Sequence, residues 1–211
     1  MEQYRPSHTR RIGLIGGTFD PVHYGHLVVA EEVRFVCKLD DMVFVPAGQP
    51  PHKQGGIITP AHHRLAMLEL AVSSNPHFSL SLVDMERTGP SYTVETLRLL
   101  HQQWGQSAEL YFVIGWDSLE EFHTWHDPSG ILAELTYLVA VHRPGYIAEP
   151  EYVAAMEARL PLLKQRLLTI PAPQLEISAT ELRQRILEGR PIKYQVPEAV
   201  EQYIVQHRLY Q

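Results

Sequence analysis

The sequence of 211 residues contains a single cysteine, Cys37, so it cannot form an intramolecular disulfide, which fits a reducing compartment. It has no apolar run of membrane-spanning length, and residues 1–10 lack the apolar core of a signal peptide. The formal net charge of -6 disfavours binding to nucleic acid or anionic membranes through a basic surface. We therefore expect a cytoplasmic protein that binds any phosphate at a local site.

The chain has enough apolar residues, 45%, to bury one sizeable core. Short apolar segments alternate with stretches of helical periodicity, such as residues 27–36, 65–72 and 94–100. The expected strands are RIGLIG (11–16), DMVFVP (41–46), FSLSLVD (78–84), ELYFVIG (109–115) and TYLVAVH (136–142). This alternation predicts right-handed βαβ units in a Rossmann-like, doubly wound α/β fold with a mostly parallel sheet.

We expect a single domain over residues 1–211, with a leader at 1–10 and the Rossmann-like core at 11–170. Residues 171–211 are predicted to form a small helical cap of two short helices, separated by Gly189 and Pro191. Earlier in the chain, Thr59 and Pro60 are expected to be the N-cap and first residue of a helix.

The stretch GGTFDPVHYGHL, residues 16–27, follows the first expected strand. Glycines allow close approach of the backbone to a phosphate, and a helix N-terminus offers free N–H groups. Pro21 is expected to end the strand's ladder, and Tyr24 or Gly25 to begin a helix. His23 and His26 would then share one face of its first turn and form an anion clamp, whose charged form a neighbouring phosphate favours.

Other phosphate and metal motifs are absent from the sequence. The stretch lacks the GK[ST] ending of a P-loop and the GxGxxG dinucleotide fingerprint, and the chain has no HExxH or CxxC motif. We therefore expect no metal site built by the protein. Four further histidines are expected to be solvated or packed: His62, His63, His123 and His126.

The segment ISATELRQRI, residues 177–186, offers a second group of phosphate ligands. Ser178 is a good N-cap, Thr180 lies in the first turn, and Arg183 follows on the same face with a forked donor for phosphate oxygens. An ordinary capping box between Ser178 and Glu181 is an alternative that can hold at the same time.

GGTFDPVHYGHL resembles the HxGH signature of the nucleotidyltransferase superfamily, and ISATELRQRI, about 150 residues later, resembles its ISSTxIR signature with Ala179 in place of a serine. The resemblance implies that both motifs meet on the triphosphate of ATP. It implies catalytic roles for His23, His26 and Arg183. It also implies that the following residues bind ATP: Gly16, Gly17, Thr18, Phe19, Gly115, Asp117, Ser178 and Thr180.

Three further segments resemble bacterial nicotinate-nucleotide adenylyltransferases: PAGQPPHK (46–53), ERTGPSYTVETL (86–97) and VIGWDSLEEFHTW (113–125). In that family's pattern Lys53, Tyr92, Thr93 and Trp125 would bind nicotinate mononucleotide, with Trp125 stacked on the pyridine ring, and Asp117 would hold a ribose hydroxyl. Trp116 and His126 depart from the common pattern, and we expect both to affect selectivity.

The implied reaction joins ATP and nicotinate mononucleotide into deamido-NAD and pyrophosphate, with Mg²⁺ bound to ATP. Two alternatives stay open: a transferase of the same fold acting on phosphopantetheine or nicotinamide mononucleotide, and a nucleotide-sensing module without turnover. The sequence leaves the homo-oligomeric state, and closure of the loop at residues 46–58, undetermined.

Overall fold

The computed structural model describes residues 9–50, 58–105, 108–145, 150–173 and 175–211. Its six strands form one sheet in the order β3-β2-β1-β4-β5-β6, and each pair of neighbours is parallel. The strands are β1 (Arg11–Gly17), β2 (Asp41–Pro46), β3 (Phe78–Leu80), β4 (Glu109–Gly115), β5 (Tyr137–His142) and β6 (Leu167–Pro171). The predicted Rossmann-like, doubly wound fold is confirmed.

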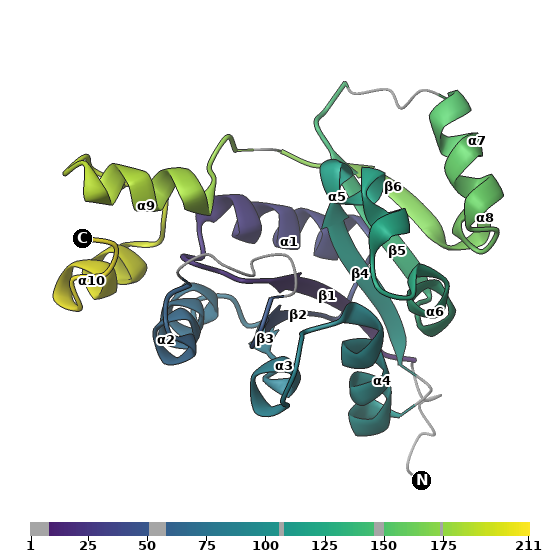
Figure 1. The fold of residues 1–211 in the computed structure, drawn as a ribbon, viewed down its shortest axis with the longest axis horizontal. Helices are drawn as coiled ribbons and strands as arrows, with labels where there is room; N and C mark the ends of the chain where they lie inside the picture. The colour runs from purple at the N-terminus through teal and green to yellow at the C-terminus, as the bar shows by residue number, and fades with distance from the viewer. Residues whose placement is uncertain (1–8, 51–57, 106–107, 146–149, 174) are drawn as a thin grey trace, which may run out of the picture.

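Helices cover both faces of this sheet (Figure 1). They are α1 (Tyr24–Val36), α2 (Ala61–Val72), α3 (Val83–Glu86), α4 (Thr93–Trp104), α5 (Trp116–Glu120), the 3-10 helix η2 (Phe122–Thr124), α6 (Pro128–Glu134), α7 (Pro150–Arg159), α8 (Leu163–Arg166), α9 (Ala179–Leu187) and α10 (Glu198–Gln206). No helix in the described ranges is both long and apolar enough to cross a membrane.

The core is split by the sheet because successive strand residues point to opposite faces. In β4, Leu110, Phe112 and Ile114 join the cluster under α4 and α6, whereas Tyr111 and Val113 join the cluster under α1 and α2. Helices α9 and α10, at the left of Figure 1, add apolar side chains to the cluster under α1 and α2, and α10 packs against α2. The predicted pair of C-terminal helices is therefore present and packs against the main core.

Two strand predictions were wrong. The sixth strand, β6, was not expected, because it is a short edge strand that fully buries only Ile170 and so lacks a clear apolar pattern. The segment 78–84 was expected to be one strand, but β3 ends at Leu80 and Val83 begins the short helix α3. The buried polar side chain of Asp84 is hydrogen-bonded there by α4, which is an arrangement that no local pattern reveals.

Boundaries near the site also differ from the prediction. Strand β1 ends at Gly17, before Pro21, although α1 begins at Tyr24 as expected. Helix α2 begins at Ala61 with Pro60 as its N-cap, so Thr59 does not cap it. Instead the Thr59 N–H donates to the carboxylate of Asp20, at 3.2 Å. Thr59 is therefore bound to the loop after β1 and does not cap α2.

Candidate functional site

The strand order reverses between β1 and β4, and the carboxyl ends of these strands border a cavity of about 380 Å³. Chains leaving two such strands turn toward opposite faces of the sheet, so a crevice opens between them, where ligands of open α/β sheets bind. The cavity is lined by Ile15, Gly16, His23, Gly25, His26, Val29, Phe112, Val113, Ile114, Gly115, Ser118, Trp125, Val141, Leu175 and Ile177.

The two histidines of the first motif lie together at the start of α1, as their spacing predicted. Their ring centroids are 3.7 Å apart, and the backbone N–H of His23 donates to Nδ1 of the His26 ring at 3.2 Å. Gly25 makes room for this pair, because a Cβ atom there would lie 2.9 Å from Nδ1 of His23. The glycine in the motif is thus required by the position of the imidazole.

His23 is only 7% exposed, and its Nδ1 atom has no hydrogen-bond partner within the described ranges. Burial lowers the pKa of His23 to about 4, because the charged form loses its hydration. The sequence suggested a charged ring beside phosphate, but in the protein alone His23 is neutral at physiological pH. It can therefore offer a neutral N–H donor to an anion.

Phe19 packs against His26. Its ring is buried and meets the His26 ring edge-on, with centroids 5.1 Å apart. Gly17 leaves space for that ring, since a Cβ atom there would lie 3.0 Å from it. The Phe19 side chain is thus part of the core, and contact of this residue with ATP stays a prediction.

The two motifs meet through Asp20 and Arg183. Nη1 of Arg183 donates to the backbone oxygen of Asp20 at 2.7 Å, and Nη2 donates to the Thr180 hydroxyl at 3.3 Å. The Ser178 hydroxyl accepts a hydrogen bond from the Glu181 N–H at 3.1 Å and caps α9. Folding thus brings the loop at Asp20, just before His23, onto the first turns of α9, and the binding of one triphosphate by both motifs stays a prediction.

The buried carboxylate of Asp20 is held from two other parts of the chain. It accepts hydrogen bonds from the Tyr210 hydroxyl at 2.7 Å and from the Thr59 N–H at 3.2 Å. Burial, with a contribution from Asp20, raises the pKa of Tyr210, so the hydroxyl keeps its proton and acts as the donor. The last turn of the chain is therefore tied to the loop that carries His23.

A second cavity of about 230 Å³ adjoins the first and shares Trp125 with it. Its lining consists of Gly17, Thr18, Ala47, Pro50, Ser91, Tyr92, Thr93, Trp125, His126 and Ile131. Tyr92 stacks on His126, with ring centroids 4.1 Å apart, and Thr93 is the first residue of α4. Aromatic faces and a helix N-terminus therefore surround this second space.

Five candidate site residues in the described ranges line neither of these two cavities: Phe19, Asp117, Ser178, Thr180 and Arg183. Asp117 is exposed at the start of α5, where the next residue, Ser118, lines the first cavity instead. Trp116 is buried in the core, and its Nε1 donates to Glu120 at 3.1 Å, so its effect on selectivity stays a prediction. Lys53 lies outside the described residues.

Arg64 is a structural residue of the site that sequence reasoning missed. It is 1% exposed, and its guanidinium donates to the backbone oxygens of Thr18 at 2.9 Å and Ala47 at 2.8 Å. These oxygens belong to the loops after β1 and β2, so one side chain joins both walls of the second cavity. The sequence did contain a sign of this role, because the helical spacing places Arg64 on the same buried face of α2 as Met67 and Leu68.

Fold and site together define a Rossmann-like α/β protein with a nucleotide-sized double cavity at the switch point. The cytidylyltransferase-like family model matches residues 14–185. A probable nicotinate-nucleotide adenylyltransferase of Thermomicrobium roseum is 49% identical, over 95% of this chain and 91% of the relative, and one of Bacillus pumilus is 42% identical, over 96% and 99%. The chain therefore belongs to the cytidylyltransferase-like family and, within it, to the nicotinate-nucleotide adenylyltransferases.

Solved structures support the fold. Plasmodium falciparum nicotinic acid mononucleotide adenylyltransferase complexed with NaAD matches with a TM-score of 0.75 and 19% identity, over 95% of this chain and 97% of that one. The same enzyme complexed with APC gives a TM-score of 0.69 at 20% identity, with the same coverage. The six-stranded arrangement is therefore retained at low sequence identity.

The low pKa of His23 predicts a pH-dependent stability. Below pH 6.5 the unfolded chain binds a proton at His23, whereas the folded protein stays neutral there down to about pH 4. The contribution of neutral His23 to the free energy of unfolding is complete above pH 6.5 and is lost as the pH falls to 4. The loss amounts to on the order of 3 kcal/mol. Urea unfolding at pH 7 and 4.5 should show a smaller loss in His23→Asn than in the wild type.

The control for this measurement is His123→Asn, which changes an exposed histidine. It should follow the wild-type pH dependence. Equal losses of unfolding free energy in His23→Asn and the wild type would contradict the assignment of a depressed pKa to His23.

Proposed function

We propose that this protein transfers the adenylyl group of ATP to nicotinate mononucleotide, which yields deamido-NAD and pyrophosphate. The observation that carries the proposal is the pair of adjoining cavities that meet at Trp125, with the histidine pair in one and Tyr92 and Thr93 in the other. Two substrates held in these spaces would meet near the end of β1. Relatives at 49% and 42% identity are named for this activity.

The chemistry needs alignment and charge neutralisation rather than a protein nucleophile. A phosphate oxygen of the acceptor attacks the α-phosphorus of ATP, its P–O bond forms, and the bond to the β-phosphate oxygen breaks with release of pyrophosphate. Because the attacking group is already an anion, the protein stabilises the transition state by placing donors around the phosphates.

We assign His26 to the α-phosphate, with the neutral His23 ring and Thr18 nearby. Ser178, Thr180 and Arg183 would hold the departing pyrophosphate, since Arg183 is fixed next to the histidine loop by its bond to Asp20. Gly16 and Gly115, at the ends of β1 and β4, let ATP approach the backbone closely. The ATP contacts of Gly17 and Phe19 would come from the backbone of the same loop.

Mg²⁺ is proposed to accompany ATP. In the stretches of chain that the structure describes, no group of three or more His, Cys, Asp or Glu side chains is arranged to hold a metal ion. Bound with ATP, the ion would be coordinated mainly by phosphate oxygens and water, and it would neutralise triphosphate charge. The part left to the protein is to orient the phosphates through its histidines and Arg183.

The acceptor would lie in the second cavity. Trp125 can stack on the pyridine ring, and the first N–H groups of α4 with the Thr93 hydroxyl can donate to the nicotinate carboxylate. Tyr92 would close the space with its ring, Lys53 would supply charge near phosphate, and Asp117 would hold a ribose hydroxyl. A site rich in donors selects a carboxylate over a carboxamide, because the amide also needs an acceptor.

The single-domain organisation and the cytoplasmic location stay predictions. The contribution of α9 and α10 to the apolar cluster under α1 and α2 supports one folding unit for residues 11–211.

The direct test is pyrophosphate release from ATP and Mg²⁺ by the purified protein, with nicotinate mononucleotide, nicotinamide mononucleotide and phosphopantetheine offered separately. We expect much faster release with nicotinate mononucleotide than with the other two. Preference for another acceptor would retain the ATP site and overturn the assignment of Tyr92, Thr93 and Trp125. ATP binding without release in every case would support a sensing module.

His26→Ala should reduce turnover by on the order of a hundredfold or more, because one preorganised donor to the reacting phosphate is lost. His26→Asn, which keeps a polar side chain at the start of α1, is the matched variant for folding. Both should show cooperative thermal unfolding. Near-normal turnover in folded His26→Ala would remove this residue from the catalytic assignment.

Trp125→Ala should raise the KM for nicotinate mononucleotide far more than the KM for ATP, since it removes the stacking surface from the acceptor cavity. Trp125→Phe keeps an aromatic face, so its KM for nicotinate mononucleotide should lie between those of Trp125→Ala and the wild type. Steady-state kinetics with each substrate varied in turn measures both constants. Equal increases in the two KM values would argue against stacking on the pyridine.

A further inference from the structure

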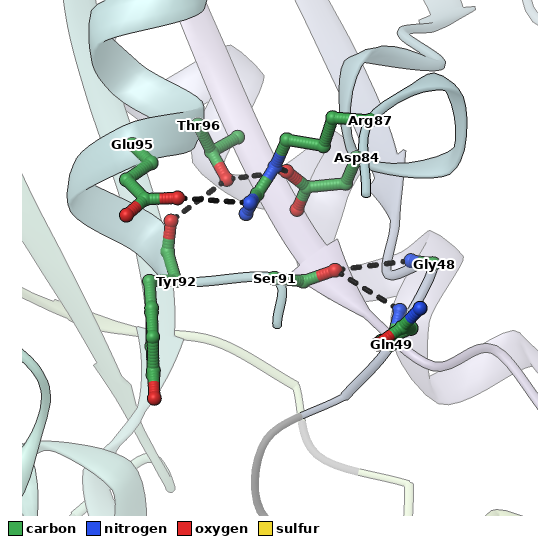
Figure 2. Close-up of polar contacts among 8 residues, drawn as sticks. All are labelled: Gly48, Gln49, Asp84, Arg87, Ser91, Tyr92, Glu95 and Thr96. Carbon is green, nitrogen blue, oxygen red and sulfur yellow. Dashed lines mark hydrogen bonds and ion pairs between the residues drawn. The ribbon is translucent and has the colours of Figure 1, made fainter. Parts of the chain in front are cut away.

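A buried polar cluster lies behind the second cavity, outside its lining (Figure 2). The Asp84 carboxylate is almost fully buried and accepts hydrogen bonds from the Thr96 hydroxyl at 2.7 Å and from Nε of Arg87 at 2.9 Å. Nη1 of Arg87 then pairs with Glu95 at 2.9 Å. Helices α3 and α4 are thereby joined through charge and hydrogen bonds rather than by apolar packing alone.

The cluster holds the residue that begins α4. The Thr96 hydroxyl lies 3.1 Å from the backbone oxygen of Tyr92, an oxygen that also accepts the N–H groups of Glu95 and Thr96. Figure 2 shows the Tyr92 ring pointing away from Asp84, Arg87 and Thr96. The backbone oxygen of Tyr92 is therefore held by the first turn of α4, which the Thr96–Asp84 hydrogen bond joins to α3, while the Tyr92 residue lines the cavity.

The same part of the chain also holds the opposite wall of the cavity. The Ser91 hydroxyl accepts hydrogen bonds from the N–H groups of Gly48 at 3.1 Å and Gln49 at 3.3 Å (Figure 2), and the Ser91 N–H donates to the Gln49 oxygen at 2.9 Å. Gly48 packs directly on the backbone oxygen of Asp84, which leaves no room for a Cβ atom. The loop after β2 and the start of α4 are thus held in fixed positions relative to each other.

We propose that Thr96, acting with Asp84 and Arg87, is a positioning residue that determines the affinity for the acceptor nucleotide. The inference rests on the proposed function and deepens it. Thr96 does not line either cavity, so it acts through Tyr92 and Thr93. Since binding geometry must hold to within a fraction of an ångström, loss of the hydrogen bond from Thr96 to Asp84, which joins the first turn of α4 to α3, should weaken acceptor binding.

The effect should be confined to one substrate, because the ATP cavity is built mainly from other elements. Its lining comes from β1, β4 and β5, from α1 and α5, and from the segment before α9, and Trp125 is the one residue shared by the two linings. The side-chain hydrogen bonds of Asp84, Arg87 and Thr96 within the described ranges go to one another, to Glu95 and to the Tyr92 oxygen, and none reaches these elements. A purely structural role would instead lower stability and affect both substrates alike.

The test compares Thr96→Val with Thr96→Ser in the full-length protein. Valine keeps the shape but loses the hydroxyl, whereas serine keeps the hydroxyl. We expect Thr96→Val to raise the KM for nicotinate mononucleotide about tenfold while the KM for ATP changes less than about twofold, and Thr96→Ser to remain near wild type. Equal changes in both KM values, or no change in either, would overturn the inference.

A second variant decides the matter if Thr96→Val does not fold. Arg87→Lys keeps the positive charge but loses the fork that bridges Asp84 and Glu95, and it should raise the acceptor KM selectively. Arg34→Lys, at an arginine paired with Glu31 on α1, is the matched control and should leave both KM values unchanged. A selective effect in the control, or none in Arg87→Lys, would count against the inference.

The two proposals fail in different ways. If the wild-type protein does not use nicotinate mononucleotide, the proposed function is wrong. If the wild type uses it but the variants lack the selective rise in KM for that substrate, only the positioning role is wrong.

Discussion

The buried carboxylate of Asp20 is the interaction on which the arrangement of the site depends. A buried charge is costly unless hydrogen bonds replace its hydration, so the groups that reach it are held firmly. Tyr210 and Thr59 supply those bonds from distant parts of the chain, and Arg183 binds the backbone oxygen of the same residue. The histidine loop, the start of α2, helix α9 and the last turn are therefore fixed relative to one another.

Two further buried polar side chains, Arg64 and Asp84, fix the elements around the second cavity in the same way. Arg64 binds the backbone oxygens of the loops after β1 and β2, and Asp84 joins α3 to the beginning of α4. Each is charged and nearly inaccessible to water. Donors and aromatic faces are consequently preorganised around the two cavities, which is the condition under which electrostatic stabilisation of a phosphoryl transition state is effective.

The parts of the fold that could be predicted are those with a strong local pattern. Strands β1, β2, β4 and β5 are apolar segments buried on both faces, and α1 and α4 begin where their sequences indicate. Strand β6 and the turn into α3 were missed because an edge strand buries few residues and because Asp84 takes its partners from another helix. The cap predicted at Thr59 was wrong because α2 begins one residue later than expected, with Pro60 at the N-cap position.

The sequence by itself determined the class of fold, the presence of the histidine motif and the ISATELR motif, and the spacing that places the ring of His23 next to that of His26, because each depends on the local order of residues. Only the tertiary structure decided that the motifs meet at Asp20, that His23 is buried and neutral, and that Trp116 and Phe19 belong to the core. Burial and long-range hydrogen bonds arise from packing between distant segments, so no short stretch of sequence contains them.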